Sequence, residues 1–354
     1  MLPYLIFGLI ALAVLMYVLL DGWDLGVGIL FLAAPRDQER DKMMDSIVPF
    51  WDGNETWLVF CGVTLFGTFP IVYASALQVF YLPVMVMLFG LVFRGISFEF
   101  RAHTTGSRTL WNWAFGLGSI VAAFSQGMML GRFIQGMPLQ PPPFGQTFTI
   151  NLFPLLCGLA MLAGYSLLGA AWLVYKTDGT TQTFAREVSL SVWLLTMATF
   201  VVASVWTPLS VGEVARRWFG FPQGLLFLGL AAALIAAAVV FRRSIWNSAN
   251  DARLLQLAVL MTFLAFAGFA GTIWPYAVPY RLPIADAAAD PVTLRFVLVG
   301  IVIVLPIVVA YQLYAYRAFA GKVRADAFTY EAPIVPTAIH ARRVHDSDPA
   351  LHFS

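Results

Sequence analysis

Charge is scarce in this sequence. Only 11% of the residues are Asp, Glu, Lys or Arg, whereas 60% are apolar or aromatic and the mean hydropathy is +0.79. A soluble domain carries roughly 25% charged residues. The chain therefore lacks the charge to cover a water-exposed surface, and much of its exterior must face lipid. The net charge of +2 is too small, and the positive residues too scattered, to indicate a nucleic-acid partner.

Cysteine is also rare, and the common sequence motifs of cofactor sites are missing. Cys61 and Cys157 both lie in apolar stretches, which favours small core residues over a disulfide or a metal pair. No P-loop, GxGxxG or zinc-spaced Cys/His cluster occurs. We therefore expect no metal site in this chain.

Histidine is absent from the apolar segments. His103 lies in a polar stretch, and the other three are near the C-terminus, at His340, His345 and His352. A haem between helices takes axial His, Met or Cys ligands. The methionines of the apolar segments favour core packing: Met128, Met129 and Met161. We expect this chain to bind no haem or other cofactor directly.

Nine apolar segments are long enough to cross a bilayer, which takes about 20 residues per helix. The first has neither a basic start nor a small-residue cleavage site, which indicates a retained helix. The prediction is an all-α polytopic membrane protein, with a transmembrane helical domain over 1–322 and a cytoplasmic mobile tail over 323–354. The predicted spans cover about 4–33, 54–72, 75–98, 113–134, 151–175, 188–208, 222–241, 254–275 and 293–316.

The positive residues predict the orientation. With nine spans, sixteen of the 21 Lys and Arg fall in the C-terminal tail or in the loops that share its side, and five fall on the other side. Cytoplasmic loops are enriched in Lys and Arg. We therefore expect a periplasmic N-terminus and a cytoplasmic C-terminus.

Three polar motifs interrupt the first apolar segments. "DGWDLGVG" places Asp21 and Asp24 on one helix face, and its Gly22 and Gly26 allow a neighbouring helix to come close. "PFWDGNETWL" carries the acids Asp52 and Glu55, again three residues apart. "FRGISFEFR" places two arginines seven residues apart on one face and an acid elsewhere: Arg94, Arg101 and Glu99. All three motifs are predicted at the cytoplasmic end of the first three helices.

Two interpretations explain these charges. An ionised acid that faces lipid costs about 2.5–3.5 kcal/mol, so the acids must face protein, pair with donors or bind protons. They form either a buried ion-pair network that fixes helix register or a relay that carries protons from the cytoplasm. The residues alone leave both open. For Trp51 and Trp57, packing and interface roles are favoured over stacking on a quinone.

These motifs, with "WPYAVP" at 274–279, resemble subunit II of the cytochrome bd-type quinol oxidases, and most closely the cyanide-insensitive branch. The resemblance covers about residues 1–322. It implies two four-helix bundles plus one peripheral helix, without haem ligands.

The resemblance also implies a function in aerobic respiration. The chain would pair, in a bacterial inner membrane, with a haem-carrying subunit I that oxidises quinol and reduces dioxygen to water. That partner would hold two haems b and a haem d, or a third haem b, and small accessory subunits can join the complex. The protons consumed would come from the cytoplasm.

The resemblance assigns roles to some of the polar residues. Asp21 and Asp52 match acids implicated in a proton route, whereas Asp24 and Trp51 match signature residues of less settled role. The proton-pathway candidates are thus Asp21, Asp24, Asp52, Glu55 and Glu99, with a supporting polar network of Arg94, Arg101 and Trp51. Phe50 stands where some family members have a histidine, so no role of that histidine is carried over.

Two other functions are compatible with buried acids. A proton-coupled secondary transporter also has them, but transporters often show repeated broken helices, and no second set of acids is evident here. A purely structural assembly subunit differs only in whether its residues carry protons.

Overall fold

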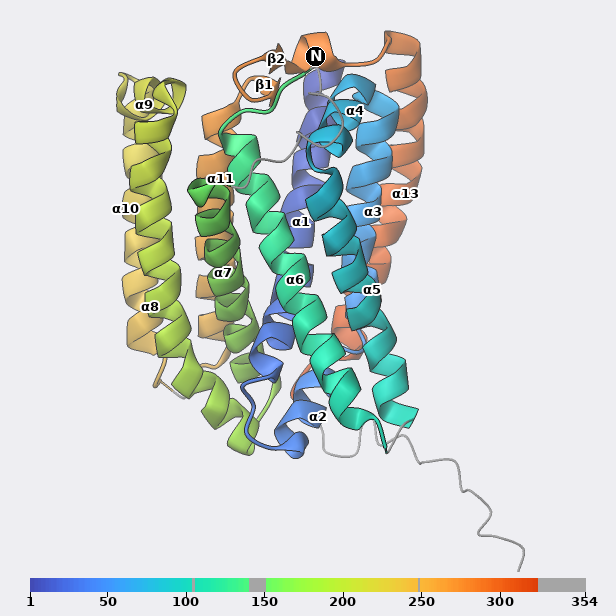
Figure 1. Ribbon diagram of the computed structural model, residues 1–354, viewed down its shortest axis with the longest axis vertical. Coiled ribbons are helices and arrows are strands. Elements are labelled where there is room, and N and C mark those ends of the chain that lie inside the picture. Colours follow the sequence, from blue (N-terminus) through green and yellow to red (C-terminus); the bar gives the residue numbers. More distant parts are fainter. Residues whose placement is uncertain (104–105, 140–150, 248, 324–354) are drawn as a thin grey trace, which may run out of the picture.

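The structure is a bundle of long, nearly parallel helices (Figure 1). This computed structural model describes residues 1–103, 106–139, 151–247 and 249–323. Its long helices are α1 (Leu2–Phe31), α3 (Trp51–Thr68), α5 (Tyr81–His103), α6 (Arg108–Ile134), α7 (Leu152–Lys176), α8 (Gly179–Ser210), α10 (Gln223–Ser244), α11 (Ala252–Ile273) and α13 (Pro291–Ala318).

Eight of these helices are long and apolar enough to cross a membrane, which confirms an all-α polytopic membrane protein. The exception is α3, the counterpart of the predicted span 54–72. Its hydropathy is lowered by polar residues in its first two turns: Asp52, Asn54 and Glu55. The ninth crossing therefore stays a prediction, as does the division into two four-helix bundles and a peripheral helix. The predicted tail falls almost entirely outside the described residues.

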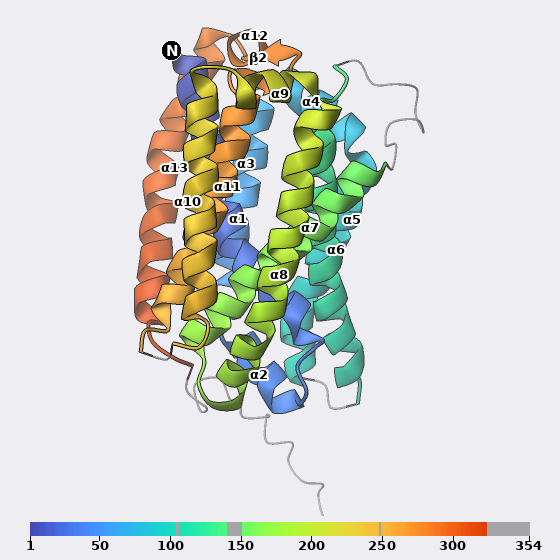
Figure 2. The ribbon, with the colours of Figure 1, turned by 90° about the vertical axis from the view of Figure 1, so that its left-hand side faces the viewer.

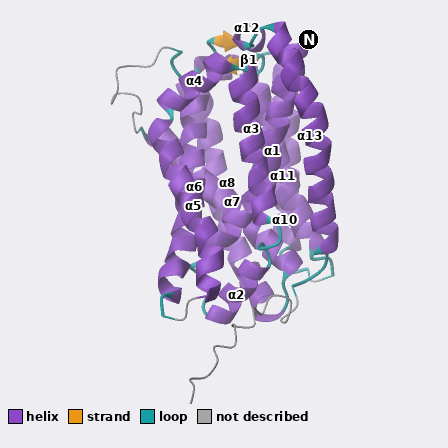
Figure 3. Ribbon diagram, turned by 90° about the vertical axis from the view of Figure 1, so that its right-hand side faces the viewer, coloured by secondary structure: helices purple, strands orange, loops and turns teal. Residues whose placement is uncertain are grey.

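Shorter elements lie at the two ends of the bundle (Figure 3). At one end is α2 (Asp37–Asp45); at the other are α4 (Pro70–Val79), α9 (Gly212–Phe219), α12 (Ile284–Ala287) and the two-stranded sheet of β1 (Tyr276–Val278) and β2 (Leu282–Pro283). The N-terminus shares the second end. The start of the third span was predicted at 75, but α5 begins at Tyr81 because α4 is a separate short helix that Pro70 initiates.

Helix α1 lies inside the bundle and packs against α7, α3 and α6 (Figure 2). Its glycines bring α7 to backbone distance. A Cβ atom at Gly26 would lie 1.8 Å from the Tyr165 carbonyl oxygen, and one at Gly169 would lie 2.3 Å from the Gly26 carbonyl carbon. The predicted close approach of a neighbouring helix to this glycine strip is confirmed.

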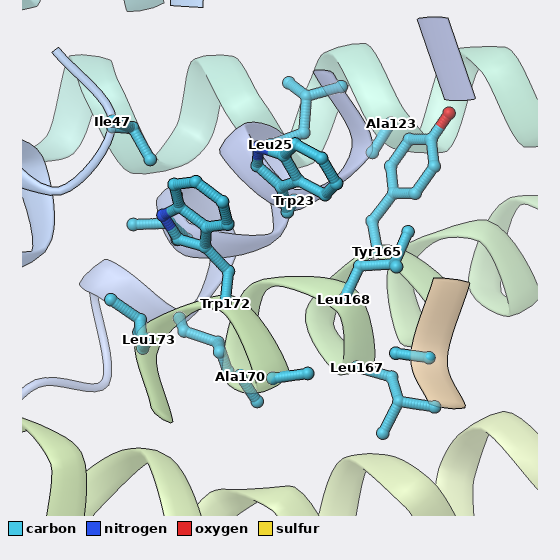
Figure 4. Close-up of a cluster of buried hydrophobic side chains, with 14 of the residues drawn as sticks. Trp23, Leu25, Ile47, Ala123, Tyr165, Leu167, Leu168, Ala170, Trp172 and Leu173 are labelled. Carbon is cyan, nitrogen blue, oxygen red and sulfur yellow. The ribbon is translucent and has the colours of Figure 1, made fainter. Parts of the chain in front are cut away.

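The main apolar core surrounds this crossing. The indoles of Trp23 and Trp172 stack with ring centroids 4.9 Å apart, and Tyr165 lies farther along α7 (Figure 4). A second apolar cluster joins Ile6, Phe69, Val278 and Ile284 at the N-terminal end of the bundle. The outer faces of α8, α10 and α13 expose large apolar side chains, as expected of surfaces that meet lipid.

Candidate functional site

Three of the predicted site residues meet around one arginine. Arg94 Nη1 donates to Asp21 Oδ1 at 2.8 Å and to Glu55 Oε1 at 3.2 Å. Its Nη2 lies 3.9 Å from Asp24 Oδ2. We call Asp21, Asp24, Glu55 and Arg94 the carboxyl cluster. It joins α1, α3 and α5, so the predicted convergence of the three motifs holds for these residues.

The carboxyl cluster has more acids than bases. Asp21, Asp24 and Arg94 have 0% exposed side chains, whereas Glu55 is 25% exposed. One guanidinium balances one carboxylate, so the cluster is electrically neutral only when it holds two protons. Burial of an unbalanced charge is costly. The arrangement can therefore store protons, and Glu55 is its link to the surface.

A hydrogen-bonded chain of amides reaches Asp24 from α13. Asn54 Nδ2 donates to Asp24 Oδ2 at 2.7 Å and to the Leu20 carbonyl at 3.3 Å. Asn54 Oδ1 accepts from Gln312 Nε2 at 2.5 Å and from the Tyr316 hydroxyl at 3.0 Å. Trp57 Nε1 donates to Gln312 Oε1 at 3.1 Å. We call Trp57, Gln312 and Asn54 the amide chain.

Each buried aspartate has one oxygen without a partner among the described residues. Asp21 Oδ1 is bound by Arg94 while Asp21 Oδ2 is unpaired, and Asp24 Oδ2 is bound by Asn54 while Asp24 Oδ1 is unpaired. Arg94 Nε is likewise unpaired in this part of the chain. Buried polar atoms of this kind usually bind ordered water.

A second series of hydrogen bonds lies on the N-terminal side of Asp21, away from the end of the bundle that carries α2. Gln126 Nε2 donates to the Tyr17 hydroxyl at 2.7 Å, and the Tyr165 hydroxyl donates to Gln126 Oε1 at 2.8 Å. Tyr17 precedes Asp21 by four residues, so the two share a face of α1. Polar groups thus continue from the carboxyl cluster towards the middle of the bundle.

The remaining predicted residues lie apart from the carboxyl cluster. Asp52 is exposed in the first turn of α3, and Glu99 is exposed beside His103, 3.6 Å away. Trp51 stacks on Phe98 with centroids 4.8 Å apart. This stacking is a packing contact, whereas the place of Trp51 in a supporting polar network stays a prediction.

Arg101 belongs to a separate group at the end of the bundle. Its Nε donates to Asn112 Oδ1 at 2.6 Å, its Nη2 lies 2.7 Å from Asp41 Oδ1, and its guanidinium lies over the Phe31 ring. Asp41 also pairs with Arg108. This group ties α2 to α5 and α6.

Two titratable groups at this end lie outside the membrane-spanning helices. Burial, reinforced by the nearby Asp41 carboxylate, raises the pKa of Asp45 to about 6. For Asp251 burial acts to raise the pKa, but the Lys322 ammonium and the Gln182 amide outweigh it, so the pKa lies below its usual range. Asp251 also pairs with Arg186 at 2.5 Å and thereby holds the chain after α13 against α8.

The Phe50 side chain lies in an aromatic cluster. It stacks on Tyr316 with centroids 4.5 Å apart and meets Trp172 edge-on, while Lys176 Nζ lies 5.1 Å from its ring. An apolar ring therefore fills this position, and Phe50 contributes no titrating group to the site.

The histidine and the cysteines among the described residues of this chain do not fit a haem. The histidine, His103, is exposed at the last residue of α5, where it contacts Glu99. Cys61 and Cys157 are free thiols that lie in apolar surroundings. Within the described ranges, no three His, Cys, Asp or Glu side chains are grouped to hold a metal ion.

Sequence reasoning missed the amides and tyrosines of the site. Asn54 lies inside a motif that was singled out for its acids, and its polarity in an apolar helix was the available signal. Gln312 and Tyr316 are four residues apart near the end of the last predicted span, and Gln126 is a lone amide within another. A polar residue inside a predicted span is therefore the common signal for all of them.

The known proteins that resemble this chain include subunits of cytochrome oxidases. A family model described as cytochrome bd terminal oxidase subunit II matches residues 2–319. The cytochrome bd-I ubiquinol oxidase subunit 2 of Escherichia coli is 26% identical, over 90% of this chain and 94% of the relative. A probable cytochrome oxidase subunit 2 of Haemophilus influenzae is 28% identical, over 86% and 91%.

A solved structure shares the fold. The bd oxidase of Geobacillus thermodenitrificans contains a chain that superposes with a TM-score of 0.73 at 16% sequence identity, covering 90% of this chain and 98% of that one.

Proposed function

Because this chain belongs to the cytochrome bd terminal oxidase subunit II family, we propose that it is the non-haem subunit of a terminal quinol oxidase. It pairs with a haem-carrying subunit I, which oxidises quinol and reduces dioxygen to water. Haems b and d, or a third haem b, belong to that partner. This assignment of the haems is supported by the poor fit of the described residues of this chain to a haem.

Family membership and the eight apolar helices make the chain a multi-pass protein of a bacterial inner membrane. In our proposal the N-terminus is periplasmic and the end that carries α2 is cytoplasmic. The distribution of Lys and Arg supports this orientation. α3 is then the ninth crossing, alongside α1 and α13.

The chain also contributes a proton route from the cytoplasm to the oxygen-reducing site. The observation that carries this proposal is the carboxyl cluster, in which three carboxyl groups share one buried guanidinium. Asp52 collects protons at the exposed start of α3, one helical turn before Glu55. Glu55 passes them to Asp21 across the Arg94 guanidinium that binds both.

Substitution of the two end residues tests the route. In the assembled complex, Asp21→Asn removes the proton-binding group without changing its shape, and oxygen consumption should fall about 100-fold, the lower range for a lost proton-transfer group. Asp52→Asn should slow oxygen consumption less, because Asp52 is exposed and water can replace it. Haem content and copurification with subunit I should be unchanged.

Glu99→Gln is the matched control, because Glu99 is an exposed acid near the same end of the bundle but outside the carboxyl cluster. It should leave the rate as in the parent complex. If Asp21→Asn and Asp52→Asn lose haem or partner instead, these acids are structural. Parent-like oxygen consumption in both variants would refute the route.

A further inference from the structure

In the amide chain, the donor and the acceptor of each hydrogen bond are fixed. An indole N–H can only donate a hydrogen bond. Trp57 Nε1 contacts Gln312, so the atom of Gln312 that faces it must be the amide oxygen, and the Gln312 NH2 group must face Asn54. Trp57 is buried, at 2% exposure, and Gln312 is 7% exposed, so water has little access to reverse this order.

Gln312 in turn fixes the orientation of the Asn54 amide. Its oxygen accepts from Gln312 Nε2, which turns its own NH2 group towards Asp24 Oδ2 and the Leu20 carbonyl. The Leu20 carbonyl can only accept, so it reinforces the same orientation. The Tyr316 hydroxyl sets no direction, because a hydroxyl can donate or accept.

We propose that Trp57 and Gln312 are positioning residues that keep the Asn54 amide as a donor to Asp24. In that orientation Asp24 Oδ2 accepts from an N–H group, which favours a proton of Asp24 on Oδ1, the oxygen left unpaired in the described chain. The tryptophan thus determines, through two amides, which oxygen of a buried acid exchanges protons. The consequence for turnover rests on the proposed proton route, whereas the orientation itself does not.

Infrared spectroscopy of the assembled complex tests the orientation. The difference between the parent and Asp24→Asn spectra identifies the Asp24 band, as a carbonyl stretch of the acid or a stretch of the carboxylate. In Gln312→Met the hydrogen bond that holds Asn54 is lost, and the Asp24 band should shift. Trp57→Phe keeps an aromatic ring but removes the donor, and it should shift the band in the same direction.

Tyr316→Phe is the matched control, because it removes a donor to the same Asn54 oxygen and keeps the stacked ring. It should leave the Asp24 band in place. An unshifted band in both Gln312→Met and Trp57→Phe overturns the proposal. A shift in Tyr316→Phe as large as that in Gln312→Met overturns it too, because the tyrosine would then set the orientation.

Turnover provides the second readout. If Asp24 takes part in the route, Gln312→Met should lower kcat for quinol oxidation about tenfold, the effect of losing about 1.4 kcal/mol of hydrogen bonding, with KM for quinol unchanged. In the Asp24→Asn background the same substitution should have no further effect. An equal loss in both backgrounds would overturn the action of Gln312 through Asp24. Failure of the proton route would remove the turnover effect but leave the infrared shift.

Discussion

Arg94 is the residue that makes the buried acids tolerable. It is the only base within hydrogen-bond distance of Asp21 and Glu55 among the described residues. Removal of one partner from a buried ion pair costs about 3–5 kcal/mol, because the remaining charge is left uncompensated.

We therefore expect Arg94→Met to destabilise the complex by about 3–5 kcal/mol, measured as a lower thermal unfolding midpoint. Adding Asp21→Asn should restore part of the loss, since one fewer acid then needs a counter-charge. If Arg94→Met unfolds at the parent temperature, the guanidinium is dispensable and the ion-pair interpretation of the cluster is wrong.

The raised pKa of Asp45 predicts that the stability of the α2 end depends on pH. Its pKa is raised from 3.8 to about 6 by burial and then by Asp41, so folding favours its protonated form. Stability from this group is complete below about pH 4 and is lost as the pH rises through about 6. The loss should be about 1 kcal/mol, because partial exposure screens the group.

The measurement is the unfolding midpoint of the parent and of Asp45→Asn between pH 4 and pH 7, a range in which the parent should lose stability relative to the variant. Identical profiles would contradict the raised pKa.

The carboxyl cluster was predictable from sequence, but its partners were not. Charges inside apolar segments must face protein, and three such motifs near one end of consecutive helices must converge. The pairing of Asn54 with Gln312 joins positions 258 apart and depends on which helix packs beside α3, which no local pattern specifies. Arg101 shares a face with Arg94, yet seven residues place it about 10 Å farther along the helix, beyond reach of the cluster.

At the scale of elements, the α1–α7 crossing determines where the acids lie. Gly26→Ala would place a methyl group 1.8 Å from the Tyr165 carbonyl oxygen, so the two helices must separate. We expect a complex that assembles poorly, with less copurified subunit I and a lower unfolding midpoint.

Gly8→Ala on the same helix is the control, because nothing lies within 4 Å of its added Cβ. It should assemble normally, since alanine also favours helix over glycine. Equal assembly of the two variants would contradict the close crossing.

The long helices were predictable because apolar length is a strong local signal, whereas the short ones were not. α2 is polar and lies outside the apolar segments, so the sequence predicts only a connection there. α4 is apolar, so the hydropathy pattern assigns its residues to the neighbouring spans, and only Pro70 marks its start. The order of packing around α1 depends on contacts between distant segments, which composition does not specify.

At the scale of the whole molecule, charge asymmetry predicts which end faces the cytoplasm. Arg36 and Arg216 are both exposed and lie at opposite ends of the bundle, next to α2 and in α9. In a background without Cys61 and Cys157, Arg216→Cys should react with a membrane-impermeant thiol reagent added to intact spheroplasts. Arg36→Cys should react only after the membrane is opened. The reverse pattern would place the N-terminus in the cytoplasm.

The backbone contact between Gly26 and Gly169 also limits how the protein can move. A piston stroke of α1 by one turn would carry it about 5.4 Å and drive larger side chains into the α7 backbone. Both buried aspartates belong to α1, which this contact prevents from sliding past α7. In the proposed route, hydrogen ions would therefore hop between side chains within a fixed helix frame, at a rate set by local rotations of acids and amides.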